Sequence, residues 1–270
     1  LFWVDIPARQ IWRWRAGDAA PVHWQLPEQV GCIAPATQGR WVCGLETGVA
    51  LATLAGDGGP AQLEFVATVE HPLQGMRFND GRCDRQGRFR AGTMLQDMAA
   101  ARAVGTVYGL DSAGQQDLQP LHGALLTPNG MAFSPDGRTM YLSDSHPLSQ
   151  QIWQFDYDPS NGRMSRQRLF VDMNQHPGRP DGAAVDEDGC YWICANDAGL
   201  LLRFTPAGQL DRSIPVPVSK PSMCAFGGVG LDTLFVTTIR LPGTPADSPA
   251  GGVFALRPGV RGIAETEFPA

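Results

Sequence analysis

Short apolar runs alternate with polar segments rich in glycine and proline along the whole chain, and one kind of run recurs six times. Each copy is about five residues long and contains an aromatic residue, four of the six also contain a β-branched residue, and the composition is typical of a β-strand. The copies cover residues 1–5, 40–44, 88–92, 140–144, 191–195 and 234–238. Their aromatic markers are between 39 and 52 residues apart, which is the period of a repeat architecture.

A second apolar run follows each copy, and several copies are preceded by a turn. The second runs cover residues 10–15, 48–54, 105–111, 151–157, 199–204 and 252–256. Segments 84–87, 134–137 and 186–189 each combine an acidic residue with a final glycine, which supplies the positive φ that a tight hairpin needs. The pattern therefore predicts six strand–turn–strand units and no helix of any length.

Six units that are each too small to bury their own faces must pack against one another. A six-bladed β-propeller does this, so we predict an all-β chain with residues 1–270 forming a single propeller domain. A β-sandwich is the alternative, but it does not account for the count of six. The first copy of the run opens the sequence, so the innermost strand of blade one is expected before residue 1.

Composition narrows the function classes. The net charge is −6 with no basic block, which makes a nucleic acid or an anionic membrane an unlikely partner because the phosphate interaction would be repulsive. No apolar run approaches the roughly 20 residues that span a bilayer. The six cysteines form no CxxC pair, so we interpret them as buried, reduced thiols of a cytoplasmic protein, which we expect to be a monomer or weak dimer.

Three polar residues recur at the starts of the predicted inner strands. They are Asn79, Asn129 and Asp181, spaced 50 and 52 residues apart and each close to a glycine. Any one of them could simply start a turn or cap a strand. Three in register on consecutive blades instead predict a shared site, because clustered oxygens in a closed channel are costly unless they bind something. Amide and carboxylate oxygens without His or Cys favour a hard cation such as Ca²⁺, Mg²⁺ or Mn²⁺.

Arg77 stands two residues before Asn79, and residues two apart on a strand share a face. We therefore expect Arg77 to reach the same site and to offer donors to hydroxyl or carboxylate oxygens. A surface ion pair with Asp80 or Asp84 is the alternative. The chain has no GxSxG motif for a serine hydrolase, and its five histidines show no metal-binding spacing.

These residues also carry a family resemblance. Residues 76–81 read Met-Arg-Phe-Asn-Asp-Gly, and the segments 87–94, 128–130, 134–137, 180–182 and 225–228 continue the likeness over nearly the whole chain. The sequence resembles the SMP-30/gluconolactonase/regucalcin family, which implies a six-bladed propeller with one catalytic divalent cation that acts on aldonolactones.

The resemblance implies roles for individual residues. Asn129 and Asp181 match the family's metal ligands, and Arg77 and Asn79 match its substrate-contacting residues. Asp97 falls where the family has an acidic substrate contact, although a Glu is more usual there. In the family, a third metal ligand, a Glu, precedes the segment with which this sequence opens. The resemblance therefore implies that lactonase activity also requires that upstream Glu.

Together these observations predict a metal-dependent lactonase that hydrolyses a sugar lactone such as gluconolactone. The cation is expected to be Ca²⁺, with Zn²⁺, Mn²⁺, Mg²⁺ or Fe²⁺ as alternatives. It would polarise the lactone carbonyl while Asp181 acts as general base. Two other functions remain open: a non-catalytic calcium-binding or regulatory propeller, and a paraoxonase-like esterase or phosphotriesterase.

Overall fold

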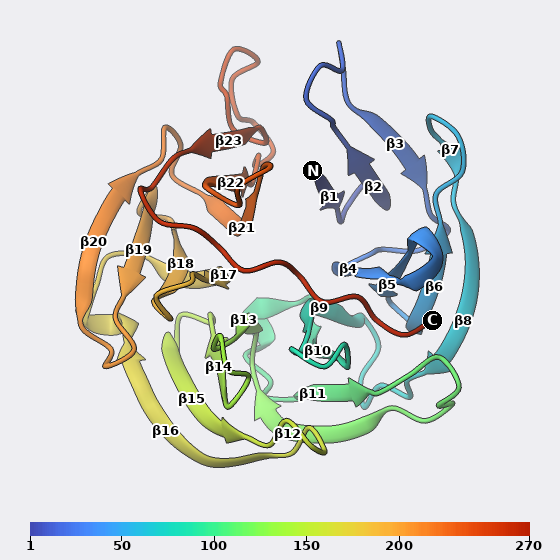
Figure 1. The fold of residues 1–270 in the computed structure, drawn as a ribbon, viewed down its shortest axis with the longest axis horizontal. Helices are drawn as coiled ribbons and strands as arrows, with labels where there is room; N and C mark the ends of the chain where they lie inside the picture. The colour runs from blue at the N-terminus through green and yellow to red at the C-terminus, as the bar shows by residue number, and fades with distance from the viewer. The chain divides into compact units, whose positions relative to one another are not determined.

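The computed structural model describes all residues from Leu1 to Ala270 and is built almost entirely of short antiparallel sheets (Figure 1). Its contacts divide it into two compact units, residues 1–128 with 265–270 and residues 129–264. Each unit contains three sheets. Five sheets have four strands and one has three, and the six together are the blades of a β-propeller. The prediction of an all-β, six-bladed fold is confirmed, whereas the prediction of one domain over 1–270 stays a prediction.

The first unit holds three four-stranded sheets. In their order across each sheet, the strands are β1 (Phe2–Asp5), β2 (Gln10–Arg13), β3 (Val22–Gln25) and β7 (Gly59–Pro60); β4 (Cys32–Ala36), β5 (Arg40–Gly44), β6 (Gly48–Thr53) and β8 (Gln62–Thr68); and β9 (Met76–Cys83), β10 (Phe89–Leu95), β11 (Gly105–Leu110) and β12 (Gln119–Leu125). The carboxyl end belongs to this unit as well, because Phe268 forms a bridge with Ala36 and is fully buried.

The second unit holds two four-stranded sheets and a three-stranded one. These are β13 (Pro128–Phe133), β14 (Thr139–Asp144), β15 (Gln151–Tyr157) and β16 (Met164–Asp172); β17 (Arg179–Val185), β18 (Tyr191–Asn196), β19 (Leu200–Phe204) and β20 (Leu210–Pro215); and β21 (Pro221–Gly227), β22 (Thr233–Thr238) and β23 (Val253–Leu256). Only single 3₁₀ turns interrupt the strands of the chain: η1 (Thr37–Gly39), η2 (Met98–Ala100) and η3 (Met173–Gln175). None of these helical segments has the length or apolar character needed to span a bilayer.

The six predicted marker runs are all strands, and their ends differ by at most a few residues from those expected. In five sheets the marker strand is the second strand, whereas β1 is an edge strand of its sheet. The two-residue strand β7 was not predicted. It pairs in parallel with β3, and so short a segment carries no periodicity to reveal it.

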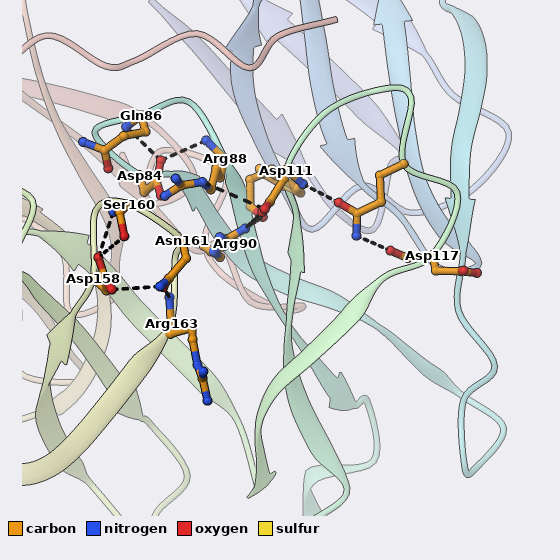
Figure 2. A network of polar contacts seen from close by, with 12 residues as sticks. Asp84, Gln86, Arg88, Arg90, Asp111, Asp117, Asp158, Ser160, Asn161 and Arg163 are labelled. Atoms are coloured by element: carbon orange, nitrogen blue, oxygen red, sulfur yellow. Dashed lines mark hydrogen bonds and ion pairs between the residues drawn. The ribbon is translucent and has the colours of Figure 1, made fainter.

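Acidic turns fix the hairpins that join the strands. In the turn between β9 and β10, Oδ1 of Asp84 accepts backbone hydrogen bonds from Gln86 and Arg88 at 2.8 and 2.9 Å (Figure 2). Gly87 has a φ of +89°, which a residue with a Cβ adopts only with strain. Asp84 also forms an ion pair of 3.1 Å with Arg88. The predicted turn at 84–87 is confirmed.

Apolar side chains fill the space between neighbouring sheets of each unit. In the second unit, one cluster joins the sheet of β13–β16 to that of β17–β20 through residues such as Ala132, Tyr141, Ile193 and Phe204, each at most 3% exposed. Side chains of the marker strands point alternately to the two neighbouring sheets, so even Trp192 is fully buried. Packing of this kind holds the first strands of these sheets, which carry the candidate site, in a fixed register.

All six cysteines are buried, and no disulfide joins any of them. Burial raises the pKa of the Cys43 and Cys83 thiols far above the ordinary value. Burial is likewise the main cause of the raised pKa of Cys32 and of Cys190. These thiols are packing groups rather than nucleophiles.

Candidate active site

The two predicted metal ligands lie at the starts of β13 and β17, the first strands of adjacent sheets in the second unit. Gly130 follows Asn129 and has a φ of +58°, so the backbone changes direction directly after Asn129. An ideal Cβ at Gly130 would lie 3.2 Å from the backbone oxygen of Asp181. The two strands therefore approach each other closely at the residues that the sequence analysis singled out.

Two hydrogen bonds between these sheets fix that approach. The Tyr191 hydroxyl donates to the Gly130 backbone oxygen at 2.7 Å, and the Ser143 hydroxyl donates to the Pro180 backbone oxygen at 3.3 Å. Tyr191 and Ser143 are both fully buried. Each bond holds the backbone next to one of the candidate ligands.

Asn129 is buried, with 7% of its surface exposed. Its Nδ2 donates a hydrogen bond of 3.0 Å to Oγ of Ser145, which is also buried. This bond fixes the orientation of the amide, because the nitrogen must face Ser145. The Oδ1 atom of Asn129 accepts no hydrogen bond, and it is the atom that could ligate a cation.

Asp181 has a partner that the sequence analysis missed. Asn196, the last residue of β18, is 2% exposed, and its Nδ2 donates a hydrogen bond of 2.7 Å to Oδ2 of Asp181. The Oδ1 atom of Asn196 is buried and has no hydrogen-bond partner. A buried acceptor left unsatisfied costs about 1–3 kcal/mol, so this oxygen is a candidate contact for a bound water or cation.

The sequence holds a signal for Asn196, although a weak one. The six marker strands consist mainly of apolar and small residues, and Asn196 adds a buried amide directly after the fifth of them. Its importance depends on the orientation of the side chain toward Asp181, which periodicity does not show.

The oxygen atoms near the starts of β13 and β17 suit a hard divalent cation. The polar atoms suited to a cation are the amide oxygens of Asn129 and Asn196 and the carboxylate oxygens of Asp181. No three or more His, Cys, Asp and Glu residues are grouped so that they could hold a metal ion by themselves. Oxygen donors without His or Cys are the ligands preferred by Ca²⁺, Mg²⁺ and Mn²⁺ rather than by structural zinc. The residues present therefore fit such an ion.

Arg77 and Asn79 lie on β9 in the first unit, where their side chains contact each other. Nη1 of Arg77 donates to Oδ1 of Asn79 at 2.9 Å and to the Phe78 backbone oxygen at 2.8 Å. Nδ2 of Asn79 donates to the backbone oxygen of Pro128 at 3.0 Å, and Pro128 directly precedes Asn129 in the chain. The two side chains thus form one polar group, as their spacing on the strand predicted. Their role toward a substrate stays a prediction.

Asp97 lies in the loop after β10, directly before η2, and is exposed. The backbone of its neighbour Gln96 donates to the oxygen of Gly75, the residue before β9, at 3.0 Å. The loop is therefore anchored at the end of the sheet where Arg77 lies. The carboxylate of Asp97 accepts no hydrogen bond from the protein, which leaves it open to a ligand.

Fold and site together define a β-propeller with an oxygen-lined polar site at the starts of two of its blades. Comparison with known proteins identifies the class. The family described as "SMP-30/Gluconolactonase/LRE-like region" matches residues 1–240. The chain belongs to the SMP-30/gluconolactonase/LRE-like family.

Two similar proteins are sugar lactonases by name. The chain is 37% identical over 272 residues to a 6-deoxy-6-sulfogluconolactonase of Pseudomonas putida, covering 99% of this chain and 90% of that one. It is 34% identical over 274 residues to an L-arabinolactonase of Azospirillum brasilense, covering 99% and 87%. A solved luciferin-regenerating enzyme superposes with a TM-score of 0.89 at 27% identity, covering 100% of this chain and 91% of the other.

Proposed function

We propose that the protein is a metal-dependent lactonase that hydrolyses a sugar lactone such as gluconolactone to the aldonic acid. Membership of the family and the two lactonases at 34% and 37% identity support this reaction class. The single observation that carries the proposal is the oxygen-donor group of Asn129, Asp181 and Asn196. A buried, unsatisfied amide oxygen beside a carboxylate is explained by a bound cation.

Asn129 and Asp181 are the residues that hold the cation in this proposal, and Ca²⁺ is the ion that their oxygen donors suit best. The chemistry that a divalent cation supplies when bound is polarisation of the lactone carbonyl and stabilisation of the oxyanion. Ser145 keeps Oδ1 of Asn129 facing the ion through its bond to Nδ2. Asn196 orients the Asp181 carboxylate through its hydrogen bond to Oδ2 and is therefore a positioning residue.

Asp181 is also the proposed general base. It accepts the proton of the attacking water and returns it to the ring oxygen as the ring C–O bond breaks, which gives the aldonic acid. The hydrogen bond from Asn196 occupies Oδ2 and fixes the plane of the carboxylate, so the proton acceptor has a defined position. An aspartate without this partner would sample several rotamers, which costs rate because the water is then poorly aligned.

Arg77, Asn79 and Asp97 are the proposed contacts to the sugar. Arg77 and Asn79 are already bonded to each other, so their orientation is set before substrate binds. The exposed carboxylate of Asp97 accepts hydrogen bonds from sugar hydroxyls. This polar set favours hydroxylated lactones over the apolar esters and phosphotriesters of a paraoxonase-like enzyme.

A substrate panel tests the proposal. The full-length protein is assayed with Ca²⁺, Mg²⁺, Mn²⁺ or Zn²⁺ on gluconolactone, arabinolactone, a nitrophenyl ester and a phosphotriester. We expect turnover of the sugar lactones in the presence of metal and far slower reaction of the other two. Metal binding without turnover of any lactone would favour a non-catalytic calcium-binding protein, and preference for the phosphotriester would favour the paraoxonase-like alternative.

A further inference from the structure

Two cations share one carboxylate close to the candidate metal ligands. Nε of Arg179 lies 2.6 Å from Oδ2 of Asp197, and Nζ of Lys220 forms an ion pair with Oδ1 of the same carboxylate. The group thus has two positive charges and one negative charge. A local positive excess is unusual in a protein whose net charge is −6. We refer to Arg179, Lys220 and Asp197 as the basic triad.

The triad is connected to both candidate ligands. Arg179 lies opposite Asn196 in the ladder of β17 and β18, and Asn196 is the residue that bonds Asp181. Nη1 of Arg179 also lies 3.4 Å from the backbone oxygen of Ser145, whose hydroxyl holds Asn129. Arg179 is therefore paired with Asn196, the partner of Asp181, and contacts Ser145, the partner of Asn129. The positive excess therefore borders the site rather than a remote surface.

Arg179 also corresponds to Arg77 in its position within the sequence repeat. Arg179 stands two residues before Asp181, as Arg77 stands two residues before Asn79, and a register shift follows the arginine in both ladders. Arg179 is thus the counterpart, two sheets further along the chain, of the arginine proposed to contact the sugar. The sequence analysis selected Asp181 on this strand but did not select Arg179 two residues before it.

The triad retains donors for a ligand. The side chains of Arg179 and Lys220 are 24% and 20% exposed, so both are reachable from solvent. Nη2 of Arg179 donates no hydrogen bond to the protein, and Lys220 uses its ammonium group for Asp197 alone. Burial on its own would raise the pKa of Asp197, but the hydrogen bonds from Lys220 and Arg179 outweigh it and lower the pKa. Asp197 is accordingly ionised at neutral pH and holds both cations in place.

We propose that Arg179 and Lys220 form a subsite for an anionic substituent, a sulfonate, phosphate or carboxylate, on the sugar lactone. This inference rests on the proposed lactonase function and adds the substrate class. Arginine presents a planar fork that matches such oxyanions, and lysine adds a point charge. Asp197 neutralises part of this positive charge while no substrate is bound.

The experiment measures selectivity, defined as kcat/KM for 6-deoxy-6-sulfogluconolactone divided by kcat/KM for neutral gluconolactone. Lactones with a phosphate or a carboxylate at the same end of the sugar form two further arms and show which anion is preferred. In Arg179→Gln and Lys220→Met we expect selectivity for the preferred anionic lactone to fall about 10-fold to 100-fold, since each variant loses a charge-assisted hydrogen bond. Arg166→Gln removes a positive charge from an exposed side chain on β16 and is the matched control, with selectivity unchanged.

The variant Asp197→Asn removes a negative charge from the triad, whereas the two variants above each remove a positive one. It removes the competing carboxylate while leaving both cations, so selectivity for the anionic lactone should stay or rise, and its dependence on salt concentration should steepen. Equal selectivity in the wild type, Arg179→Gln and Lys220→Met, with neutral lactone turned over, would overturn the subsite and leave the lactonase proposal standing. No turnover of any lactone by the metal-loaded wild type would instead overturn the proposed function itself.

Discussion

The side-chain nitrogen of Asn196 donates a 2.7 Å hydrogen bond to Oδ2 of Asp181, and the amide oxygen of Asn196 is buried without a partner. This pair links the end of β18 to the start of β17. It orients the one carboxylate of the proposed metal centre. It also accounts for one of the two polar atoms of the buried Asn196 side chain, and leaves the amide oxygen for a ligand of the proposed metal centre.

Replacing Asn196 therefore tests the metal centre without removing a charge. In Asn196→Leu, which has a similar volume, we expect the dissociation constant for Ca²⁺ or Mn²⁺ to rise about 10-fold to 100-fold, the usual effect of losing a residue that orients a metal ligand. Titration calorimetry or the electron paramagnetic resonance signal of Mn²⁺ measures this without an activity assay. Asn161→Ala, in an exposed turn, is the control. An unchanged affinity in a folded Asn196→Leu protein would remove Asn196 from the site.

Tyr191 should contribute stability through its hydroxyl. In Tyr191→Phe the Gly130 backbone oxygen loses a 2.7 Å hydrogen bond inside the protein, and we expect the free energy of unfolding to fall by about 1–3 kcal/mol. Tyr141→Phe is a close control, because Tyr141 is also buried but its hydroxyl makes no hydrogen bond within the protein. Urea unfolding monitored by circular dichroism compares the two. Equal losses in both variants would show that the bond to Gly130 contributes nothing specific.

Gly130 should not accept a side chain. Its φ is +58°, and a Cβ would lie 2.5 Å from Oη of Tyr191 and 2.7 Å from Oγ of Ser143. Gly130→Ala should thus suffer both backbone strain and overlap, whereas Gly39→Ala, with a φ of +69° and open space around it, suffers about 1–2 kcal/mol of strain alone. We expect a larger loss of the melting temperature, and weaker metal binding, for Gly130→Ala. Similar melting temperatures for the two variants would contradict the close approach of β13 and β17.

The fold was largely predictable because each blade carries its own strong local signal. Phe89 and Trp192 mark equivalent strands 103 residues apart, and the glycines at 87 and 189 close equivalent turns with φ values of +89° and +80°. The candidate ligands could be predicted for the same reason, since a polar residue recurs at the start of successive repeats. Because the repeats form equivalent blades, the position of a residue within its repeat predicts its place in the blade.

The residues around the ligands could not be found in this way. Asn196, Ser145 and Arg179 each contact a ligand or its partner, and their places depend on how the strands pair, including the register shift between Pro180 and Ala183 in the ladder of β17 and β18. A one-residue shift turns a side chain to the other face of a sheet, and no pattern in the sequence locates such a shift. β7 escaped prediction because two residues show no alternation.

The cysteines provide a test of burial that is independent of the site. All six are buried, and burial raises the pKa of Cys32, Cys43, Cys83 and Cys190, so the reactive thiolate is scarce in the folded protein even at mildly alkaline pH. We expect almost no reaction with a chromogenic disulfide reagent at pH 8 in the native state, and reaction of all six thiols after unfolding in guanidinium. Rapid reaction of several thiols in the native protein would contradict the packing described above.

The most direct test of the central claim is gluconolactone hydrolysis before and after removal of divalent metal, in the wild type and in Asp181→Ala. The account predicts that chelation abolishes turnover and that added metal restores it in the wild type. Asp181→Ala should stay at least about 100-fold less active at every metal concentration, because it lacks both a ligand and the general base. Full activity in Asp181→Ala, or undiminished turnover by the wild type after complete metal removal, would contradict it.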